Sequence, residues 1–351
     1  MPPETADLSA VLATDRPVLV TGAAGFIGYH LSERLLSAGL PVTGVDNLSP
    51  YYDPQLKRAR LDRLARHRGF RFFPGDVADL AALDETFEAT RPAHVVHLAA
   101  QAGVRHSIEA PHEYGSANLT GFLNILELCR HHRPQHLVFA SSSSVYGGNT
   151  RLPYSVDDSV DHPVSLYAAT KRANELMAHS YAHLYGIPVT GLRFFTVYGP
   201  WGRPDMAYFK FTKAIFEGQR ITLYNGGDMS RDFTFIDDIN EGLVRLLGRP
   251  PQPNPAFNRA DPARGRSWAP YRIFNIGNNR SQPLLNLIET LEEIIGREAD
   301  KSYAPMQPGD VQRTWAEIDD LTEETGFQPD TPLRLGLERF VDWYRSYYGA
   351  D

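Results

Sequence analysis

The fold of this chain is decided by the stretch Val18-Leu-Val-Thr-Gly22-Ala-Ala-Gly25-Phe-Ile-Gly28. A short apolar run ends in glycines and leads directly into an amphipathic segment, which predicts a strand, a tight turn and a helix. Glycines at such a turn let the backbone approach a diphosphate, and the helix N-terminus presents free N–H groups to it. Placed between a strand and a helix, the G-x-x-G-x-x-G spacing predicts a dinucleotide site.

A carboxylate follows at the end of the second predicted strand. Asp46 closes residues 41–46 and lies 18 residues after Gly28. An acid at this place binds the ribose 2′-OH of NAD and repels the 2′-phosphate of NADP. The alternative interpretation is a turn residue that precedes Asn47. We predict NAD as the cofactor.

The composition limits the classes of partner. The chain has 351 residues, 42% of them hydrophobic, and a formal net charge of −7. This charge argues against nucleic acid and anionic membranes as partners, and no run of 18 apolar residues predicts a membrane span. Residues 1–15 are polar and are expected to form a disordered tail rather than a signal peptide. The single cysteine, Cys129, excludes disulfides within the chain and favours a cytoplasmic location.

Strands and helices are expected to alternate from residue 18 to residue 194. After the first β-α-β unit, strands are expected at 70–73, 94–98, 136–140 and 188–194, and helices at 56–64, 80–87, 113–130 and 166–185. This alternation predicts an α/β fold with a Rossmann-type, doubly wound parallel sheet. Its ligand should lie at the carboxyl ends of the strands.

The alternation loosens beyond Thr196, where glycine and proline become frequent. We expect residues 16–195 to form an NAD-binding Rossmann domain. Residues 196–351 are expected to form mainly a smaller α/β substrate-binding domain, with helices at 284–295 and 333–347. The two domains should interleave, with 232–250 returning to the first.

Tyr167 and Lys171 form the second informative pattern. Residues four apart lie on one face of a helix, and an ammonium favours the anion of a neighbouring phenol. The pair therefore predicts a tyrosine base with a lowered pKa. The alternative is a surface tyrosine beside a solvated lysine. The pair follows a predicted strand that ends in Ser141–Ser144, whose hydroxyls can bond a substrate oxygen and the phenol, although four serines are also compatible with a simple turn.

These motifs together resemble the extended short-chain dehydrogenase/reductase family, and within it the nucleotide-sugar epimerases. The glycine triplet, the serines before Val145-Tyr146-Gly147 and Tyr167-x-x-x-Lys171 carry the resemblance. Longer matching runs lie at 46–53, 161–171, 192–206 and 229–238, and most resemble the epimerases that act on UDP-glucuronate. The resemblance covers residues 17–349.

The resemblance implies a tightly bound NAD that is recycled in each turnover. The cofactor-binding residues that it implies are Gly22, Gly25, Phe26, Ile27, Gly28, Asp46, Asn47, Asp76, Val77, Leu98, Ala99, Ala100, Tyr167 and Lys171. The catalytic residues that it implies are Tyr167, Lys171, Ser142 and Ser144. The substrate-binding residues that it implies are Ser142, Ser143, Ser144, Tyr167, Thr196, Arg203, Arg231 and Asp310.

The implied reaction is 4-epimerisation of UDP-glucuronate to UDP-galacturonate. Tyr167 takes the proton of the C4 hydroxyl while hydride passes to NAD, and the 4-keto sugar turns over before hydride returns. Because that intermediate is a β-keto acid, which tends to lose CO₂, Arg203 and Thr196 are expected to hold the carboxylate away from the reactive angle. A surface position in a Gly/Pro loop is the alternative for Arg203.

Other enzymes of the same family remain open as alternatives. UDP-glucuronate decarboxylases typically carry a glutamate in place of Ser144, galactose-type epimerases an asparagine in place of Thr196, and 4,6-dehydratases an acidic pair beside the serines. A non-catalytic NAD-binding sensor would usually lose the tyrosine–lysine pair. These comparisons favour the uronate epimerase.

Two further residues and an assembly follow from the resemblance. Arg231 is expected at the UDP diphosphate and Asp310 near the nucleotide ribose. An ordinary ion pair and a turn residue are the alternatives. The family implies a homodimer through the helices at 113–130 and 166–185. No motif with metal-ligand spacing is present, so no metal site is predicted.

Overall fold

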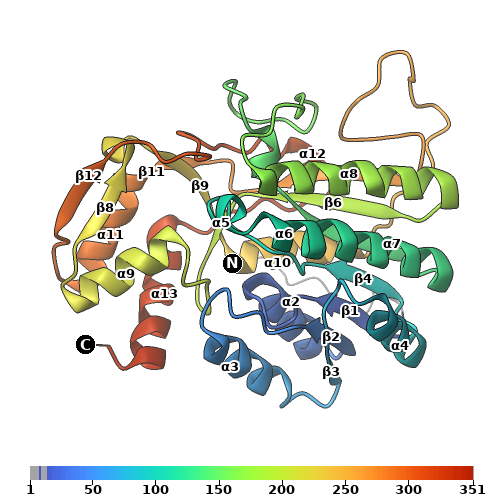
Figure 1. Cartoon of the computed structure of the whole chain (residues 1–351), viewed down its shortest axis with the longest axis horizontal. Coiled ribbons are helices and arrows are strands. Elements are labelled where there is room, and N and C mark those ends of the chain that lie inside the picture. The colour runs from blue at the N-terminus through green and yellow to red at the C-terminus, as the bar shows by residue number, and fades with distance from the viewer. Residues whose placement is uncertain (1–7, 9–13, 351) are drawn as a thin grey trace.

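A seven-stranded parallel sheet forms the centre of the computed structural model (Figure 1). Its strand order is β10-β6-β5-β4-β1-β2-β3. The strands span β1 Val18–Thr21, β2 Val42–Asp46, β3 Phe70–Pro74, β4 His94–His97, β5 His136–Ser142, β6 Val189–Phe194 and β10 Tyr271–Ile276. The strand order reverses between β1 and β4, which is where doubly wound sheets bind their ligands. The predicted Rossmann-type fold is confirmed.

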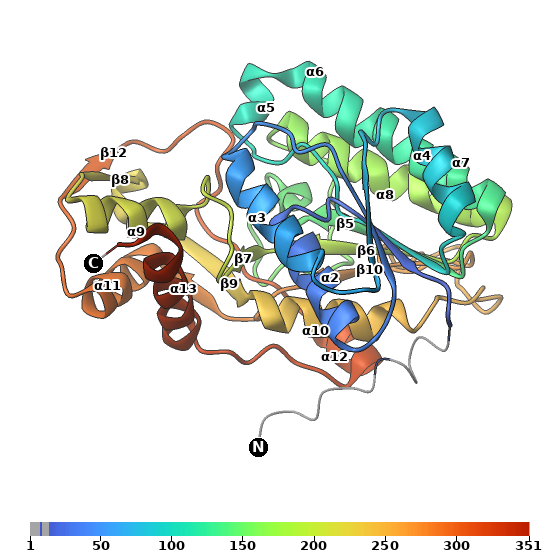
Figure 2. The ribbon, with the colours of Figure 1, turned by 90° about the horizontal axis from the view of Figure 1, so that it is seen from below.

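Helices cover both faces of this sheet (Figure 2). One face carries α2 Phe26–Ser37, α3 Pro54–Leu64, α10 Ile236–Leu247 and α12 Asp319–Thr325; the other carries α4 Leu80–Thr90, α7 Gly121–His132 and α8 Leu166–Tyr185. Every residue of β1, β2 and β4 is buried. Such uninterrupted burial is expected for strands that are covered on both sides.

Segments from beyond residue 195 return to this sheet. Strand β10 pairs with β6 in parallel and forms one edge, and α10 packs against α2. The structure describes residue 8 and residues 14–350, so most of the tail predicted at 1–15 lies outside the described residues. Leu8 belongs to that segment and is buried in the main core.

The chemistry-bearing helix α8 has the bounds that the sequence predicts, 166–185. The Ser165 side chain accepts a hydrogen bond from the Ala168 N–H at its start, and Gly186 ends it in the left-handed conformation with φ 66°. Tyr167 therefore lies in the first turn, beside the end of β5, and Lys171 follows one turn later.

The helix expected at 113–130 is an uninterrupted helical run over 111–132 whose type changes along its length. A short helix, α6, covers Pro111–Tyr114, a π-helix covers Gly115–Thr120, and α7 follows. The Asn118 side chain bonds the backbone N–H and carbonyl of Gln101 and the Thr170 hydroxyl. The Asn118 carbonyl accepts from the Asn174 side-chain amide on α8. These hydrogen bonds join the π-helix to the loop after β4 and to α8, and they stabilise its wider turns.

A smaller region lies beside the carboxyl edge of the sheet (Figure 1). It contains one sheet of β7 Thr196–Tyr198, β9 Ser230–Phe235 and β11 Ser281–Pro283, and a second of β8 Ile221–Tyr224 and β12 Lys301–Ala304. Its helices are α9 Ala207–Glu217, α11 Leu284–Ile295 and α13 Leu333–Tyr348; a further short helix, α5 His106–Glu109, follows β4. In the described part of the chain, no helix is both long and apolar enough to cross a bilayer.

Buried histidines make the fold sensitive to acid. Burial lowers the pKa of His94 to about 4 and that of His97 and His136 to about 3. In the unfolded chain these groups titrate near pH 6.5. Between about pH 6.5 and pH 4 the unfolded state therefore binds more protons than the folded state, and the free energy of unfolding decreases as the pH decreases. We expect each histidine to contribute a slope of up to about 1.4 kcal/mol per pH unit.

Urea unfolding at pH values from 7 to 5 measures this slope. His94→Phe removes one of the titrating groups, and its stability should depend less steeply on pH than that of the parent chain. A free energy of unfolding that stays constant between pH 6.5 and 5 would contradict the assignment.

Candidate active site

The residues predicted to bind the cofactor lie together in one groove of about 450 Å³. This groove follows the carboxyl ends of β1, β2, β3 and β4, and it includes all fourteen predicted residues. They are Gly22, Gly25, Phe26, Ile27, Gly28, Asp46, Asn47, Asp76, Val77, Leu98, Ala99, Ala100, Tyr167 and Lys171.

The glycines are needed for the close packing of this turn. Gly22 has φ +73°, and a Cβ there would lie 2.8 Å from the backbone nitrogen of Ala99; a Cβ on Gly28 would lie 2.1 Å from the Gly22 carbonyl oxygen. Helix α2 starts at Gly25 without a side-chain cap and with no acid in its first turn. Its first N–H groups and dipole are therefore suited to the diphosphate of a dinucleotide.

Two carboxylates shape the ribose end of the groove. Asp46 is buried and accepts hydrogen bonds from the N–H groups of Ala24 and Leu48 at 3.1 and 2.8 Å. Asp76 accepts from the Asn47 amide at 2.8 Å. These bonds orient Asp46 while it lines the groove, so the residues present fit NAD.

Sequence reasoning missed Lys57, which also lines the cofactor groove. Its ammonium donates to the Ser49 carbonyl at 2.8 Å and lies 4.6 Å from the centre of the Tyr52 ring. Burial lowers its pKa, and Asp46 opposes that shift. The sequence signal that could have identified Lys57 was its position near the start of α3, the helix that follows the strand closed by Asp46.

The residues predicted to bind the substrate line a second cavity of about 640 Å³. All eight are present: Ser142, Ser143, Ser144, Tyr167, Thr196, Arg203, Arg231 and Asp310. Both cavities share Ser142, Tyr167 and Arg203 as lining residues. The phenol therefore lies where the two cavities meet.

The pKa of Tyr167 differs from the expectation. Burial raises it, whereas a hydrogen bond with Ser142 and the charge of Arg203 lower it. The Lys171 ammonium donates to the Ala140 carbonyl at 2.9 Å, and burial lowers its own pKa to about 8. The tyrosine–lysine spacing alone therefore does not produce the lowered phenol pKa that the sequence predicts, because the structure directs the ammonium to the backbone.

The serines leave β5 in a short 3₁₀ helix at Ser143–Tyr146. The Ser142 hydroxyl accepts from the Ser144 N–H at 3.2 Å and thereby fixes the turn. Ser143 and Ser144 are half-buried and line the substrate cavity. Both hydroxyls are therefore available to a substrate oxygen.

A buried ion pair that the sequence did not reveal holds these elements together. Glu175 on α8 and Arg193 on β6 are 0% and 1% exposed and form two hydrogen bonds, at 2.9 and 3.0 Å. The Ser141 hydroxyl donates to Glu175 at 2.6 Å, and Arg193 donates to the Tyr146 hydroxyl at 3.1 Å. Glu175 lies two turns after Tyr167, so the pair sets the position of α8 against the ends of β5 and β6.

Arg203 is already paired within the chain. Its Nε and Nη2 donate to the two oxygens of Asp205 at 3.0 and 2.5 Å, and the Tyr51 hydroxyl donates to Asp205 at 3.3 Å. Sequence reasoning assigned no role to Tyr51 and did not identify Asp205. Arg203 can therefore bind a substrate carboxylate either through Nη1 or by competing with Asp205.

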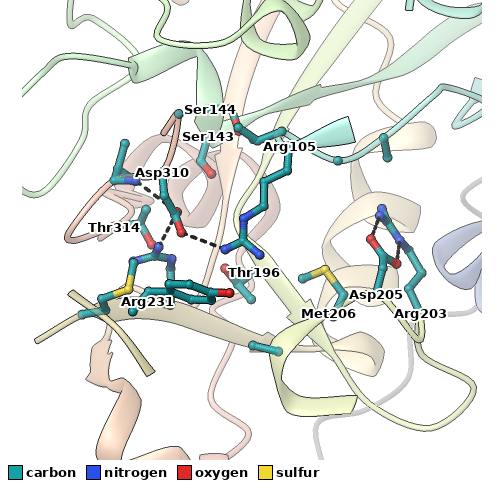
Figure 3. Close-up of a pocket in the computed structure, with 18 of the residues that line it drawn as sticks. Arg105, Ser143, Ser144, Thr196, Arg203, Asp205, Met206, Arg231, Asp310 and Thr314 are labelled. Carbon is teal, nitrogen blue, oxygen red and sulfur yellow. Dashed lines mark hydrogen bonds and ion pairs between the residues drawn. The ribbon is translucent and has the colours of Figure 1, made fainter. Parts of the chain in front are cut away.

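A second cluster of charges lies on the other side of Thr196 in the close-up view (Figure 3). Asp310 accepts from Arg231 at 2.8 Å and from Arg105 at 3.3 Å. Sequence reasoning predicted Arg231 and Asp310 but missed Arg105, which lines the same cavity. Arg105 lies between β4 and α5, in a segment that contains no recognised motif. Its position after the end of a strand was the only sequence signal that could have identified it.

Within residue 8 and residues 14–350, no group of three or more histidine, cysteine, aspartate or glutamate side chains is placed to hold an ion.

A dinucleotide groove and a substrate cavity that meet at Tyr167 define an enzyme that uses a nicotinamide cofactor. Comparison with known proteins gives the family: residues 18–260 match the NAD dependent epimerase/dehydratase family. The chain belongs to this family, and it is an NAD-dependent nucleotide-sugar epimerase.

Several relatives match over nearly the whole chain. Protein CapI of Staphylococcus aureus is 52% identical over 331 residues, covering 94% of this chain and 99% of CapI. A probable UDP-glucuronate 4-epimerase of Rhizobium meliloti is 49% identical over 334 residues, covering 94% and 97%. The UDP-glucuronic acid 4-epimerase of Bacillus cereus, solved in complex with UDP-glucuronic acid and NAD, superposes with a TM-score of 0.83 at 32% identity and covers 95% and 100%.

We expect Glu175→Gln to impair both stability and turnover. Removing one charge leaves Arg193 buried with reduced compensation, and breaking a buried pair costs about 3–5 kcal/mol of unfolding free energy. Because α8 then loses its anchor near Tyr167, kcat should fall more than KM rises. Urea unfolding and steady-state kinetics measure the two effects.

Glu241→Gln is the matched control. Glu241 bonds Arg34 and Arg245, and the side chains of the three residues remain 14%, 30% and 20% exposed, so its loss should cost clearly less unfolding free energy than the loss of the fully buried Glu175. Equal effects of the two substitutions would remove the positioning role of Glu175.

Proposed function

We propose that the chain interconverts UDP-glucuronate and UDP-galacturonate by 4-epimerisation through a 4-keto intermediate. One observation carries the proposal: an arginine suited to a carboxylate shares the cavity of Tyr167, and among the described residues that line this cavity no acid is left unpaired. Among the described residues that line the cavity, the carboxylates are Asp205 and Asp310, and each is paired with arginine. The names of the relatives from R. meliloti and B. cereus support the same substrate.

In this mechanism Tyr167 is the base for the C4 hydroxyl, and Ser142 and Ser144 donate to the substrate oxygen. Bound NAD would supply the hydride acceptor and a positive charge that favours the phenolate. The Ser142 hydrogen bond and the Arg203 charge act in the same direction on the phenol. The sugar would turn over within the cavity of about 640 Å³.

Retention of the carboxylate is the distinctive demand of this reaction. Oxidation at C4 makes a β-keto acid, whose CO₂ leaves most readily when the bond to the carboxylate stands perpendicular to the ketone plane. A guanidinium can hold a carboxylate in a fixed plane through charge-assisted bonds. Arg203 and the Thr196 hydroxyl, both in the cavity lining, are the groups that we assign to this task.

We expect the purified protein to convert UDP-glucuronate into UDP-galacturonate, because Tyr167 can act on C4 while the carboxylate is retained. Proton NMR of the nucleotide sugar measures the product.

Tyr167→Phe should lower kcat by about 100-fold or more, the scale of general-base catalysis, while NAD stays bound. A UDP-pentose as main product would indicate a decarboxylase, and full activity of Tyr167→Phe would exclude the phenol as base.

We expect Arg203→Ala to reduce kcat/KM for UDP-glucuronate by about tenfold or more relative to a neutral UDP-hexose, because one charge-assisted bond is lost. The ratio of the two kcat/KM values is the measurement, so that general damage cancels. Asp205→Asn serves as the comparison, since it keeps the arginine but weakens the pair that holds it. Equal losses on both sugars would assign Arg203 a structural role alone.

The homodimer stays a prediction. Helices α7 and α8 pack side by side and expose large apolar side chains, among them Leu123 at 41%, Leu176 at 55% and Leu184 at 65%. An apolar surface on these two helices is what the predicted dimer requires.

A further inference from the structure

Arg60, on α3, joins two segments that lie far apart in the sequence. Its Nη2 donates to the backbone carbonyls of Trp201 and Gly202 at 2.6 and 3.1 Å, immediately before Arg203. Its Nη1 donates to the Ala24 carbonyl at 2.7 Å. Because Ala24 belongs to the glycine-rich turn at the start of α2, one guanidinium bridges this turn and the loop that carries Arg203.

The positive charge of Arg60 is compensated by neutral oxygens rather than by a carboxylate. The residue is 0% exposed, and it forms no ion pair in the described part of the chain. Its acceptors are the three carbonyls and the Tyr52 hydroxyl, the last at 2.8 Å. A buried cation is costly without hydrogen-bond acceptors. A shift of the loop away from the glycine-rich turn would therefore leave buried donors of this guanidinium unbonded.

A second side chain holds the same loop from α2, the helix that packs against α3 (Figure 2). Nε2 of His30 donates to the Pro200 carbonyl at 2.8 Å. Burial lowers the pKa of His30 to about 4, so the ring is neutral at pH 7. Trp201 has φ +58°, a conformation that a non-glycine residue adopts where its surroundings impose it. The loop therefore takes its shape from its contacts with α2 and α3.

We propose that Arg60 is a positioning residue for the substrate carboxylate: it ties the backbone beside Arg203 to the glycine-rich turn and so fixes Arg203 relative to the cofactor groove. Arg60 is not among the residues that line either cavity, so it acts through the loop and touches neither substrate nor cofactor. The inference rests on the proposed uronate substrate of this cavity.

The chemical consequence of a mobile loop is loss of CO₂ from the 4-keto intermediate. If Arg203 is not held in place, the carboxylate can turn perpendicular to the ketone plane. The bond from C5 to the carboxylate then breaks, and its electron pair forms the enolate of the 4-ketone. Protonation at C5 and return of the hydride to C4 give a UDP-pentose. The ratio of UDP-pentose to UDP-galacturonate therefore reports how firmly the carboxylate is held.

Proton NMR of the products that the NAD-loaded protein forms from UDP-glucuronate measures this ratio, which does not depend on the fraction of folded enzyme. Arg60→Lys keeps the positive charge but lacks the planar fork that reaches two segments at once. We expect it to raise the ratio of UDP-pentose to UDP-galacturonate by about tenfold, because small displacements of a binding group have effects of this size or larger. Arg60→Met, which removes every donor, should raise the ratio at least as much. An unchanged ratio in Arg60→Lys would overturn the positioning role.

Arg63→Lys is the matched control, because Arg63 lies on the same helix and its guanidinium is 5.4 Å from the centre of the Trp201 ring. Its Nε donates to the Tyr29 hydroxyl at 2.7 Å, so it contacts the loop without bonding the loop backbone. This variant should give almost the product ratio of the parent chain. A ratio raised as much as in Arg60→Lys would assign the effect to packing on Trp201 and overturn the role of Arg60.

Hydrogen–deuterium exchange of the NAD-loaded protein without sugar tests the bridge independently of the reaction. In Arg60→Lys the backbone amides of residues 199–206 should exchange severalfold faster, whereas those of α8 should keep their rates. Unchanged exchange at 199–206, or equal acceleration throughout the chain, would overturn the bridge. A parent chain that forms no UDP-galacturonate would refute the proposed function and with it the carboxylate role of Arg60, while the exchange rates still decide whether Arg60 holds the loop.

Discussion

The buried pair of Glu175 and Arg193 is the interaction on which the rest of the site depends. It joins α8, which carries Tyr167, to β6, and through Ser141 it reaches the strand that ends in the serines. A pair that is almost fully buried adds little net stability over apolar packing, but it penalises any arrangement in which one partner is missing. Its contribution is therefore to position: a shift of α8 away from β6 would leave Arg193 buried without its carboxylate partner.

The sequence was sufficient for the parts of the fold that depend on local patterns. Glycine spacing, strand ends and the limits of α8 follow from backbone conformation and periodicity; the limits of α8 are as expected, and the strand ends lie within two residues of the expected ones. The pairing of Arg203 with Asp205 and the pairing of Asp310 with Arg105 depend on side-chain directions that no spacing records. The pKa of Tyr167 was missed for the same reason, because it depends on whether Lys171 bonds the phenol or the Ala140 carbonyl.

Internal ion pairs in the substrate cavity explain how a chain of net charge −7 can accept an anionic substrate. The two arginines predicted to bind the substrate each pair with a carboxylate of the chain itself. Arg203 pairs with Asp205, and Arg231 pairs with Asp310. Such pairs keep the guanidiniums ordered, which reduces the entropy that binding must offset. The substrate anion then competes with a carboxylate rather than with water alone.

The separation of the two arginine groups fits the demands of an epimerase. The sugar ring must turn over between proton removal and proton return, whereas the nucleotide must stay in place throughout. In the proposed reaction the nucleotide end, expected at Arg231 and Asp310, stays in place, and Arg203 lies apart from that pair, on the other side of Thr196 (Figure 3). In the proposed reaction, rotation about the bonds that join sugar and diphosphate would present either face of C4 to the nicotinamide while O4 stays at the phenol, so that one base would serve both directions.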